Sequence, residues 1–302
     1  MASRLTLPDI CPLQNHEFMN NGNLGTTDHN RDSAGLTYVY PVVSRRAGGV
    51  SVGINLNINN ACNWRCIYCQ VPELKRGAAP RIDLALLEQE LRDFFQELLH
   101  GDFMEQRVPA WARRVNDIAL SGNGEPTSAR EFEQVISLIG RLQQEDALPS
   151  SIKLVLITNG SLLARNYVQQ GLRKMAQLNG EVWFKLDRAS SAGMWQVNST
   201  HTTIDRVRQH LALSVSLCPT WLQTSWFMLD GELPGKQDED DYLNFVSGLL
   251  RNNIRPEGVL LYSVARPSLQ PEASRLSALP EQQLELFAQR IRALGIPVKV
   301  AA

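Results

Sequence analysis

The chain lacks the features of a membrane, secreted or low-complexity protein. No apolar run approaches the roughly 18 residues that a membrane-spanning helix needs, so we expect no membrane association. Residues 1–20 have no basic head followed by an apolar core, so we expect no signal peptide. Low-complexity segments and internal repeats are also absent.

An excess of charge of one sign is missing as well. The 302 residues include 30 basic and 31 acidic side chains, which gives a formal net charge of −1. Without a global positive field the chain has little to attract nucleic acid, although a local basic patch is compatible with this balance. The hydrophobic fraction of 43% is ordinary for a globular protein, and the length suits one large α/β domain or two small ones.

Cysteine is scarce and unevenly placed. Of the five cysteines, Cys62, Cys66 and Cys69 lie together, whereas Cys11 and Cys218 are isolated. This usage does not resemble the even framework of a secreted disulfide-rich domain. We therefore expect a reducing, cytoplasmic location in which thiolates stay free to bind metal.

Two parts of the chain differ in pattern. Residues 1–49 are polar and aperiodic, and predict an irregular N-terminal arm with a short extended piece at 36–43. Residues 50–302 contain no linker and predict one core domain. Alternating or β-branched stretches predict strands at 50–58, 117–121, 151–158, 181–187, 221–229 and 258–264, with a further short strand at 296–300. Helical periodicity predicts helices at 83–99, 128–144, 161–178, 203–217, 238–253 and 280–295, and Ser128 with Glu131 has the spacing of a capping box.

Six consecutive strand–helix units imply an α/β fold with a parallel sheet covered by helices. Right-handed crossovers wound in one direction give a barrel, but six units are too few for a complete eight-unit barrel. A partial barrel and a doubly wound open sheet both satisfy the pattern, and alternation does not decide between them.

Polar segments follow the predicted strands at one consistent position. The cysteines follow the first strand, and the segments 122–127, 158–161, 185–190 and 262–267 follow the second, third, fourth and sixth. The carboxyl ends of parallel strands share one edge, which is where ligands bind in both candidate architectures. We therefore expect these segments to form a single site.

The spacing of the three cysteines indicates a metal centre with an open position. Four thiolates close a tetrahedral zinc site, whereas a 4Fe–4S cluster held by three cysteines keeps one iron free for another ligand. Three alternatives remain: incidental buried cysteines, a zinc site completed by a distant Cys11, Cys218 or His, and an electron-transfer cluster with a remote fourth ligand.

Two motifs carry a family resemblance. CNWRCIYC (62–69) resembles the CxxxCx(aromatic)C signature of the radical S-adenosylmethionine (radical SAM) superfamily, and GNGEP (122–126) resembles its Gly-Gly-Glu-Pro motif. The resemblance spans about residues 50–300 and implies the partial, TIM-like (βα)6 barrel of that superfamily. The segments 54–72 and 260–267 are similar to Fe–S oxidoreductases grouped near the tRNA wyosine-base synthases.

The resemblance implies roles for individual residues. Cys62, Cys66 and Cys69 would each hold one iron of a 4Fe–4S cluster, and S-adenosylmethionine would bind the fourth iron. Tyr68 would lie near the adenine, and the methionine amino group would contact Gly122, Asn123, Gly124 and Glu125. Asn123 replaces the usual motif glycine, and we expect the turn to persist because asparagine tolerates left-handed backbone angles.

Further candidates end the later strands. Thr158, Asn159, Lys185 and Asp187 are assigned to the cofactor, since the family often contacts its ribose or carboxylate after the fourth strand; alternatively, Lys185 and Asp187 pair with each other. Weaker candidates lie at the ends of the fifth and sixth strands. They are Gln223, Ser225 and Trp226, of which only a subset can face inside, and Tyr262 and Arg266. Arg266 would clamp an anionic group or anchor a loop, and Cys218 would donate a hydrogen atom or simply be buried.

The resemblance implies a radical enzyme. A one-electron donor such as flavodoxin or ferredoxin would reduce the cluster, and cleavage of S-adenosylmethionine would give a 5′-deoxyadenosyl radical that abstracts hydrogen from the substrate. A small-molecule substrate is favoured over RNA, because the net charge is −1 and only Cys11 precedes the motif. The alternatives are a wyosine-synthase-like enzyme that modifies a tRNA base, and a non-enzymatic Fe–S or zinc-binding protein.

Overall fold

The computed structural model describes residues 24, 35–44 and 48–301, and its centre is a curved sheet. The sheet has eight strands in the spatial order β1 (Val39–Ser44), β2 (Gly49–Ile54), β5 (Val115–Leu120), β6 (Lys153–Thr158), β7 (Gly180–Lys185), β8 (Thr220–Ser225), β10 (Gly258–Tyr262) and β12 (Val298–Ala301). Strand β1 is antiparallel to β2, and every other neighbouring pair is parallel.

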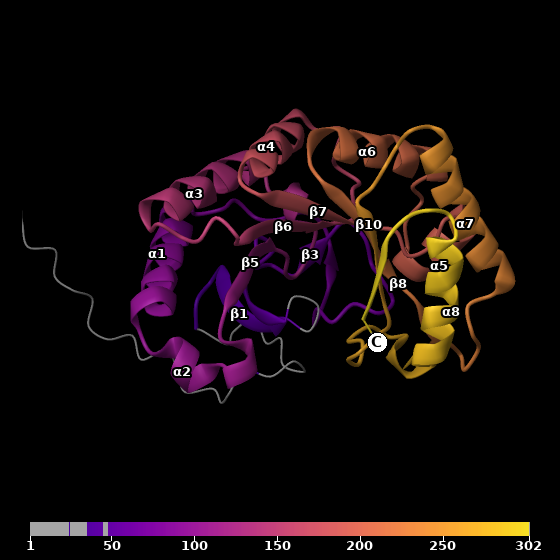
Figure 1. The fold of residues 1–302 in the computed structure, drawn as a ribbon, viewed down its shortest axis with the longest axis horizontal. Coiled ribbons are helices and arrows are strands. Elements are labelled where there is room, and N and C mark those ends of the chain that lie inside the picture. The colour runs from indigo at the N-terminus through magenta and orange to yellow at the C-terminus, as the bar shows by residue number, and fades with distance from the viewer. Residues whose placement is uncertain (1–23, 25–34, 45–47, 302) are drawn as a thin grey trace, which may run out of the picture.

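Six long helices connect the parallel strands in chain order. They are α1 (Leu84–His100), α3 (Phe132–Glu145), α4 (Asn166–Gln177), α6 (Ile204–Leu217), α7 (Lys236–Arg251) and α8 (Glu281–Arg292). Figure 1 shows them in an arc around the outside of the sheet, which places the concave face inside. This arrangement confirms the partial (βα)6 barrel and the final strand, and it is incompatible with a doubly wound sheet because that fold has helices on both faces.

Alternation along the strands divides the two faces of the sheet. Val52, Ile118 and Leu154 occupy one row of paired strands and are buried in the core beneath the helices. The next row begins with Gly53, which faces the ring of Tyr40 on β1. A Cβ atom at position 53 would lie 2.3 Å from the Tyr40 ring, so only glycine admits this aromatic ring.

The predicted strand 221–229 is interrupted, which corrects its expected length. Strand β8 ends at Ser225, and Trp226 turns into a buried cluster with Phe287 and Tyr242. After this turn, β9 (Phe227–Leu229) pairs with β11 (Leu276–Ala278) in a separate antiparallel ribbon. Burial of the large indole among aromatic rings thus overrides the β-propensity of the stretch.

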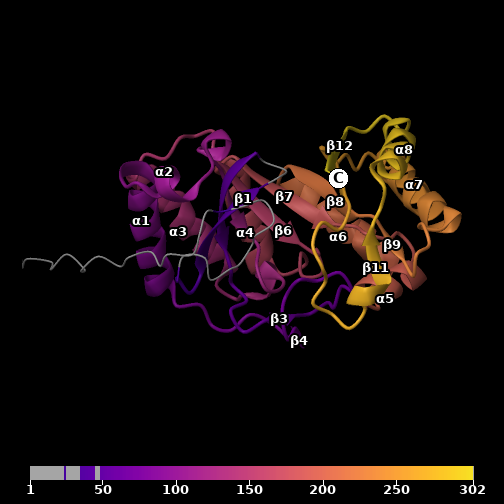
Figure 2. The same cartoon turned by 90° about the horizontal axis from the view of Figure 1, so that it is seen from below.

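Short elements lie between the main units. They comprise β3 (Ala61–Cys62), β4 (Lys75–Arg76), α2 (Phe103–Arg107), α5 (Ser191–Asn198) and the 3-10 turns Ala110–Ala112, Pro126–Ser128 and Ala273–Arg275. Figure 2 shows β3 and β4 along the same edge of the barrel as α5 and β11. Helix α5 was not anticipated from the sequence; its N-cap is Ser190, whose Oγ accepts a hydrogen bond from the Gly193 amide.

The predicted capping box of Ser128 and Glu131 is wrong. Helix α3 begins at Phe132, and Ser128 ends a 3-10 turn instead. The Ser128 hydroxyl donates to the Glu125 carbonyl oxygen at 2.6 Å. The Ser128 side chain therefore bonds to the GNGEP segment before the helix and does not cap the N-terminus of α3.

The extended piece expected within residues 1–49 is confirmed as β1, so the sheet begins before residue 50. Cys11 and most of the proposed arm lie outside the described residues, and the division of the chain at residue 50 stays a prediction. Among the described residues, no helix combines the length and apolarity needed to cross a lipid bilayer.

Candidate functional site

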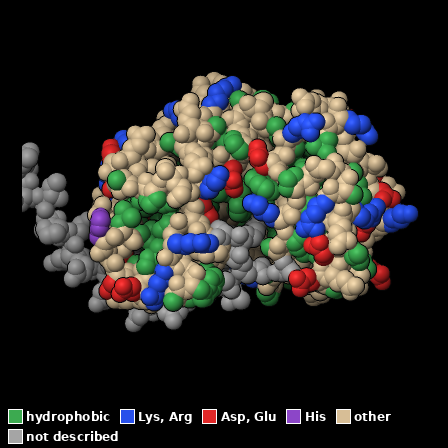
Figure 3. All heavy atoms as spheres, in the orientation of Figure 1, with side chains coloured by type: hydrophobic (Ala, Val, Ile, Leu, Met, Phe, Trp, Pro, Cys, Tyr) green, Lys and Arg blue, Asp and Glu red, His purple; other side chains and the backbone are tan. Residues whose placement is uncertain are grey.

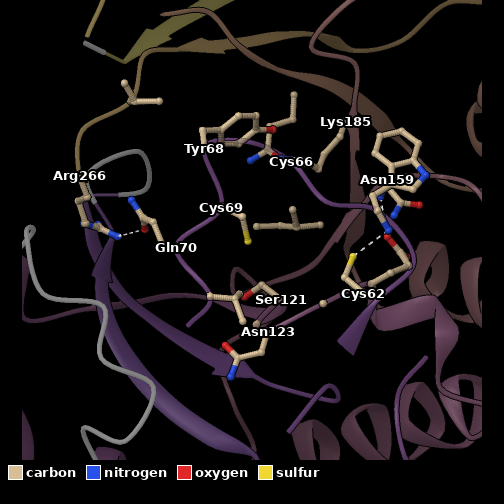
Figure 4. Close-up of a pocket in the computed structure, with 18 of the residues that line it drawn as sticks. Cys62, Cys66, Tyr68, Cys69, Gln70, Ser121, Asn123, Asn159, Lys185 and Arg266 are labelled. Atoms are coloured by element: carbon tan, nitrogen blue, oxygen red, sulfur yellow. Dashed lines mark hydrogen bonds between the residues drawn. The ribbon is translucent and has the colours of Figure 1, made fainter. Parts of the chain in front are cut away.

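The C-terminal ends of the strands surround one cavity of about 340 Å³. Its wall includes the three clustered cysteines together with Tyr68, Gly122, Asn123, Gly124, Glu125, Asn159 and Lys185. Figure 4 shows Cys62, Cys69, Asn123 and Lys185 around this common space. The expectation that separate strand ends converge on one site is therefore confirmed.

The segment that contains the three cysteines (residues 61–70), called the cysteine loop, is hydrogen-bonded to the segment that follows β10. The Cys69 carbonyl oxygen accepts hydrogen bonds from the Leu269 backbone amide at 2.9 Å, the Ser268 hydroxyl at 3.2 Å and the Gln270 side-chain amide at 3.3 Å. Ser268 and Gln270 are both buried. Residues 268–270, which follow β10, thus fix Cys69 to the second half of the barrel.

The three thiols are free of disulfides and two of them receive a hydrogen bond at sulfur. The Cys62 Sγ accepts from the Trp64 amide at 3.5 Å, and the Cys66 Sγ accepts from the Asn198 side-chain amide at 3.2 Å. Burial raises the pKa of Cys62 to about 12 and that of Cys66 to about 11. These thiols are therefore protonated without a metal, and metal binding would release their protons.

Glu125 lies at the centre of a buried hydrogen-bond network. It is 2% exposed, and its Oε1 accepts from the Thr127 hydroxyl at 2.5 Å and the Thr158 hydroxyl at 2.6 Å. Its Oε2 accepts from the Asn159 amide at 2.7 Å. Burial raises the pKa of Glu125, while these donors oppose the rise. The carboxylate therefore joins the end of β5 to the end of β6.

Asparagines that precede the cysteines form hydrogen bonds to the GNGEP segment (122–126) and hold it in place. The Asn55 Oδ1 accepts from the Asn123 amide at 3.0 Å, and the Asn123 side chain donates to Asn60 Oδ1 at 2.6 Å. Gly122 has φ +137°, and a Cβ on Gly124 would lie 2.1 Å from the Ala61 carbonyl oxygen. These contacts explain both glycines by close approach of the cysteine loop.

The expected reason for tolerating Asn123 is wrong. Asn123 is not among the residues with positive φ, so left-handed tolerance is not needed there. The residue instead uses its amide to contact Asn60, while its Oδ1 is buried without a hydrogen-bond partner in the described chain. An unpaired buried acceptor at the cavity wall suits a ligand that donates a hydrogen bond.

Lys185 and Asp187 do not form the ion pair that was the alternative to cofactor binding. Among the described residues, Asp187 accepts from Tyr68 Oη at 2.5 Å, Asn198 Nδ2 at 2.7 Å and the Ser225 amide at 2.9 Å, and no ion pair joins it to Lys185. The Lys185 ammonium lies 5.0 Å from the centre of the Tyr68 ring. Burial lowers the pKa of Lys185, but nearby Tyr262, Asp187, Cys66 and Cys69 raise it more, and the net pKa is raised.

The opposite wall is built by β8 and β10. Gln223, Tyr262 and Arg266 line the cavity there, and Figure 4 shows the hydrogen bond from Arg266 to Gln70, whose length is 3.3 Å. Gln223 is 2% exposed, and its Oε1 has no hydrogen-bond partner among the described residues. This wall thus offers a buried amide to a ligand, in contrast to the bonded carboxylate of Glu125.

Several candidates lie behind the cavity or away from it. Thr158, Asp187, Ser225 and Trp226 are buried and do not line the cavity. Cys218 begins the segment before β8, at the other end of the strands, where its thiol donates to the Gly180 carbonyl oxygen at 3.5 Å. The position of Cys218 supports the plain buried cysteine and not the hydrogen donor.

Sequence reasoning missed Asn63 and Asn198. The Asn63 Oδ1 accepts from Asn159 at 2.8 Å, and its amide donates to Ser161 at 2.7 Å, which links the cysteine loop to the end of β6. The high density of asparagine around the cysteines was a signal for Asn63. Nothing in the sequence pointed to Asn198, because it lies 129 residues after Cys69 by number and ends an unanticipated helix.

The donor set is compatible with an iron–sulfur cluster. In the described part of the chain, no group of three or more His, Cys, Asp or Glu residues is placed to hold one ion. Each cysteine of a 4Fe–4S cluster binds a different iron, so its thiolates need not meet at one point. Three free thiols around one cavity, with the unpaired Asn123 Oδ1 beside them, suit such a cluster and a ligand on its open iron.

Charge on the surface is mixed. Figure 3 shows basic and acidic side chains interspersed over the face seen in Figure 1. Ion pairs within the described chain include that of Arg141 with Glu88 at 2.7 Å and that of Arg275 with Asp230 at 2.6 Å. This face therefore has no extended area of one sign of the kind that nucleic-acid-binding surfaces carry.

No protein-family model matches the chain, but it has relatives in sequence. It is 27% identical over 295 residues to a UPF0026 protein of Synechocystis sp., which covers 87% of this chain and 96% of that protein. It is 24% identical over 249 residues to GTPase Obg of Brachyspira hyodysenteriae (81% of this chain, 32% of that protein). It is also 24% identical over 190 residues to GTP 3′,8-cyclase of Stenotrophomonas maltophilia (61% and 50%). The chain thus spans about a third and a half, respectively, of the last two relatives.

Solved structures share the fold. A structure of TYW1 with a lysine-pyruvate adduct bound has a TM-score of 0.53 at 13% identity, covering 82% of this chain and 74% of that chain. A spore photoproduct lyase variant has a TM-score of 0.55 at 8% identity (86% and 78%), and a radical SAM methyltransferase from Sphaerobacter thermophilus has 0.52 at 13% (84% and 66%). These likenesses establish that the chain shares the fold of these enzymes.

Proposed function

We propose that this protein is a radical SAM enzyme that removes a hydrogen atom from a small-molecule substrate. The observation that carries the proposal is the convergence of three free thiols and the GNGEP segment on one cavity at the strand ends. When bound, a 4Fe–4S cluster reduced by an electron donor such as flavodoxin or ferredoxin, together with S-adenosylmethionine, supplies a 5′-deoxyadenosyl radical for that step.

The cysteine loop and the C-terminal ends of β5, β6 and β7 form the first wall of the cavity, opposite the second wall of β8 and β10. The residues of the first wall would bind the cofactor. Cys62, Cys66 and Cys69 would hold three irons, and the unpaired Asn123 Oδ1 would accept a hydrogen bond from the methionine amino group. The bonded Glu125 carboxylate would act by holding the turn in shape and by adding negative charge near that amino group. Lys185, with its ammonium form favoured, suits the methionine carboxylate or a ribose oxygen.

The second wall would bind the substrate. Gln223 presents an amide without a partner in the described chain, so it suits a substrate with a hydrogen-bond donor at that position. Tyr262 and Arg266 add a hydroxyl and a guanidinium at the same side of the cavity. The volume of about 340 Å³ favours a small substrate over a macromolecule inserted deeply.

The experiment is anaerobic reconstitution with iron and sulfide, followed by dithionite and S-adenosylmethionine. We expect 5′-deoxyadenosine from the wild type and none above background from Cys66→Ala, because that variant loses one iron ligand. The matched control is Cys218→Ala, which removes a thiol away from the cavity and is expected to keep the wild-type yield. Equal 5′-deoxyadenosine from wild type and Cys66→Ala would reject the proposal.

The second candidate is an enzyme that modifies a tRNA base, since TYW1 shares the fold. In TYW1 a lysine-pyruvate adduct is bound, and Lys185 lines the cavity here. The raised pKa of Lys185 opposes adduct formation, because a protonated amine is not a nucleophile. A tight, salt-sensitive complex with tRNA in a gel shift at physiological salt would favour this candidate over the small-molecule substrate.

A non-enzymatic Fe–S or zinc-binding protein is the remaining alternative. It predicts no affinity for S-adenosylmethionine, whereas the proposed enzyme binds it in the cavity. Isothermal titration calorimetry of the reconstituted wild type with S-adenosylmethionine separates the two, with cluster-free protein as the control. Heat of binding by the reconstituted protein favours the enzyme, and its absence favours the non-enzymatic alternative.

A further inference from the structure

Asn198 is the last residue of α5 and is 1% exposed. Its Nδ2 lies 3.2 Å from the Cys66 Sγ and 2.7 Å from the Asp187 Oδ2. A sulfur ligand and a carboxylate oxygen both accept hydrogen bonds, so the NH₂ group of the amide must face them. Its two hydrogens serve one acceptor each.

The end of α5 also holds the backbone on both sides of Cys66. The Arg65 amide donates to the Asn198 carbonyl oxygen at 3.2 Å, and the Ile67 amide donates to the Val197 carbonyl oxygen at 2.9 Å. The side-chain contact to the Cys66 sulfur is therefore one of three hydrogen bonds between two consecutive helix residues and this short stretch. Cys66 is thus fixed relative to Asn198 in backbone and side chain.

Asp187 connects this contact to the barrel. Its Oδ2 also accepts from Tyr68 Oη at 2.5 Å, and its Oδ1 accepts from the Ser225 amide at 2.9 Å. The carboxylate therefore holds the Asn198 amide against the ends of β7 and β8. Because the same NH₂ group of Asn198 donates to both acceptors, it cannot turn away from the Cys66 sulfur without breaking the hydrogen bond to Asp187.

The other two cysteines have no comparable side-chain donor in the described chain. The Cys62 Sγ accepts from a backbone amide, that of Trp64, and no donor to the Cys69 Sγ occurs among the described residues. Asn198 is therefore the side chain through which substitution can change hydrogen bonding to the sulfur ligands. Hydrogen bonds to cluster sulfurs are a principal means by which proteins tune reduction potentials.

We infer that Asn198 is a positioning residue that raises the reduction potential of the cluster through its hydrogen bond to the Cys66 sulfur. The inference rests on the proposed function, because it requires the cluster. Reduction adds negative charge to the cluster and its sulfur ligands, so a fixed hydrogen-bond donor stabilises the reduced form more than the oxidised form. Asn198 would thereby make the cluster easier for its electron donor to reduce.

The test uses the reconstituted full-length protein without S-adenosylmethionine or substrate. Asn198→Leu removes the donor, and Asn198→Asp keeps the shape while replacing the donor with an acceptor. The matched control is Ser199→Gly. Ser199 has φ 49°, its backbone amide donates to the Trp195 carbonyl oxygen, and its carbonyl oxygen accepts from Arg76, so glycine keeps both hydrogen bonds. Redox titration followed by electron paramagnetic resonance gives the midpoint potential of each protein.

We expect a more negative midpoint potential for both Asn198 variants and the wild-type potential for Ser199→Gly. Electron–nuclear double resonance of the reduced cluster should show an exchangeable proton coupling in the wild type that both Asn198 variants lack. A folded Asn198 variant that binds less iron and sulfide than the control also supports the positioning role. If Asn198→Leu does not fold, the proton coupling in Asn198→Asp decides the question, because the added charge of this variant lowers the potential by itself.

Equal midpoint potentials and equal proton couplings in wild type and Asn198→Asp, at equal cluster content, would overturn the inference and leave the proposed function intact. A wild-type protein that takes up no cluster would overturn the proposed function and this inference together. The two failures are therefore distinguishable in one set of samples.

Discussion

The two walls of the cavity each contain a buried polar side chain, but they treat it differently. Glu125 on the first wall and Gln223 on the second are both 2% exposed. Glu125 accepts hydrogen bonds from Thr127, Thr158 and Asn159, whereas the Gln223 Oε1 has no partner in the described chain. A satisfied buried group supports the protein itself, and an unsatisfied one is kept at a cost in stability that a bound ligand can offset.

Asn123 shows that the first wall is not entirely closed. Its backbone amide and side-chain amide are bonded to Asn55 and Asn60, but its Oδ1 is unpaired. The first wall therefore combines a rigid frame with one open acceptor, which suits a cofactor of constant shape. The second wall leaves its amide open, which suits recognition of a specific substrate.

The largest expected effect is on stability after Glu125→Ala. The change leaves the Thr158 hydroxyl and the Asn159 amide without their acceptor, so we expect the free energy of unfolding of the cluster-free protein to fall by about 3 kcal/mol. Urea denaturation measures it. The control Glu105→Ala changes an exposed glutamate and should stay within about 0.5 kcal/mol of the wild type. A similar small loss for Glu125→Ala would show that the first wall does not depend on this network.

The next effect tests the close approach of the cysteine loop to the first wall. A Cβ on Gly124 would lie 2.1 Å from the Ala61 carbonyl oxygen, and backbone cannot give way as a flexible side chain does. We expect Gly124→Ala to cost about 2 kcal/mol and to lower cluster content on reconstitution. The control is Gly235→Ala, where the nearest atom is 3.9 Å away and φ is −65°. Full cluster content in Gly124→Ala would contradict the predicted displacement of the loop.

Replacing two glutamines by methionine compares a buried amide whose oxygen is unpaired in the described chain with a hydrogen-bonded one. Gln223→Met removes a side-chain amide whose Oε1 has no partner among the described residues, so we expect a gain of about 1 kcal/mol in unfolding free energy together with loss of substrate turnover. Gln270→Met removes an amide that donates to the Val71 carbonyl oxygen at 3.0 Å, so we expect a loss of about 1 kcal/mol. Melting curves of the two cluster-free variants give the signs. A destabilised Gln223→Met would mean that this amide has a structural partner.

The smallest effect is a pH dependence at Glu125. Its folded-state pKa is raised above the ordinary value of 4.5 by burial, so the unfolded state loses this proton first as the pH rises. The stability contributed by the protonated carboxyl is therefore present below pH 4.5 and is lost as the pH rises through the folded pKa. The difference in unfolding free energy between wild type and Glu125→Gln should decrease from pH 4.5 upward. A difference that grows with pH over this range would refute the raised pKa.

The elements of the barrel could be predicted because their patterns are local. The alternation in 50–58 and the helical face in 83–99 each lie within one stretch of chain. The structure has β2 at Gly49–Ile54, shorter than predicted, and α1 at Leu84–His100. The interrupted strand 221–229 and helix α5 could not be predicted in this way. Trp226 leaves the sheet because Phe287 and Tyr242, distant in sequence, provide a better apolar site for its ring.

The sequence by itself determined the three candidate ligands and the edge of the sheet at which they lie. The spacing of Cys62, Cys66 and Cys69 and their place after a strand are properties of adjacent residues, and parallel strands bring their carboxyl ends together. Only the tertiary structure decided which polar groups are already bonded and which remain open. Glu125 is bonded because β6 lies beside β5, and Asn198 contacts the Cys66 sulfur because α5 ends against the cysteine loop. Hydrogen bonds depend on distance and direction between groups far apart in the chain, and such contacts leave no local pattern.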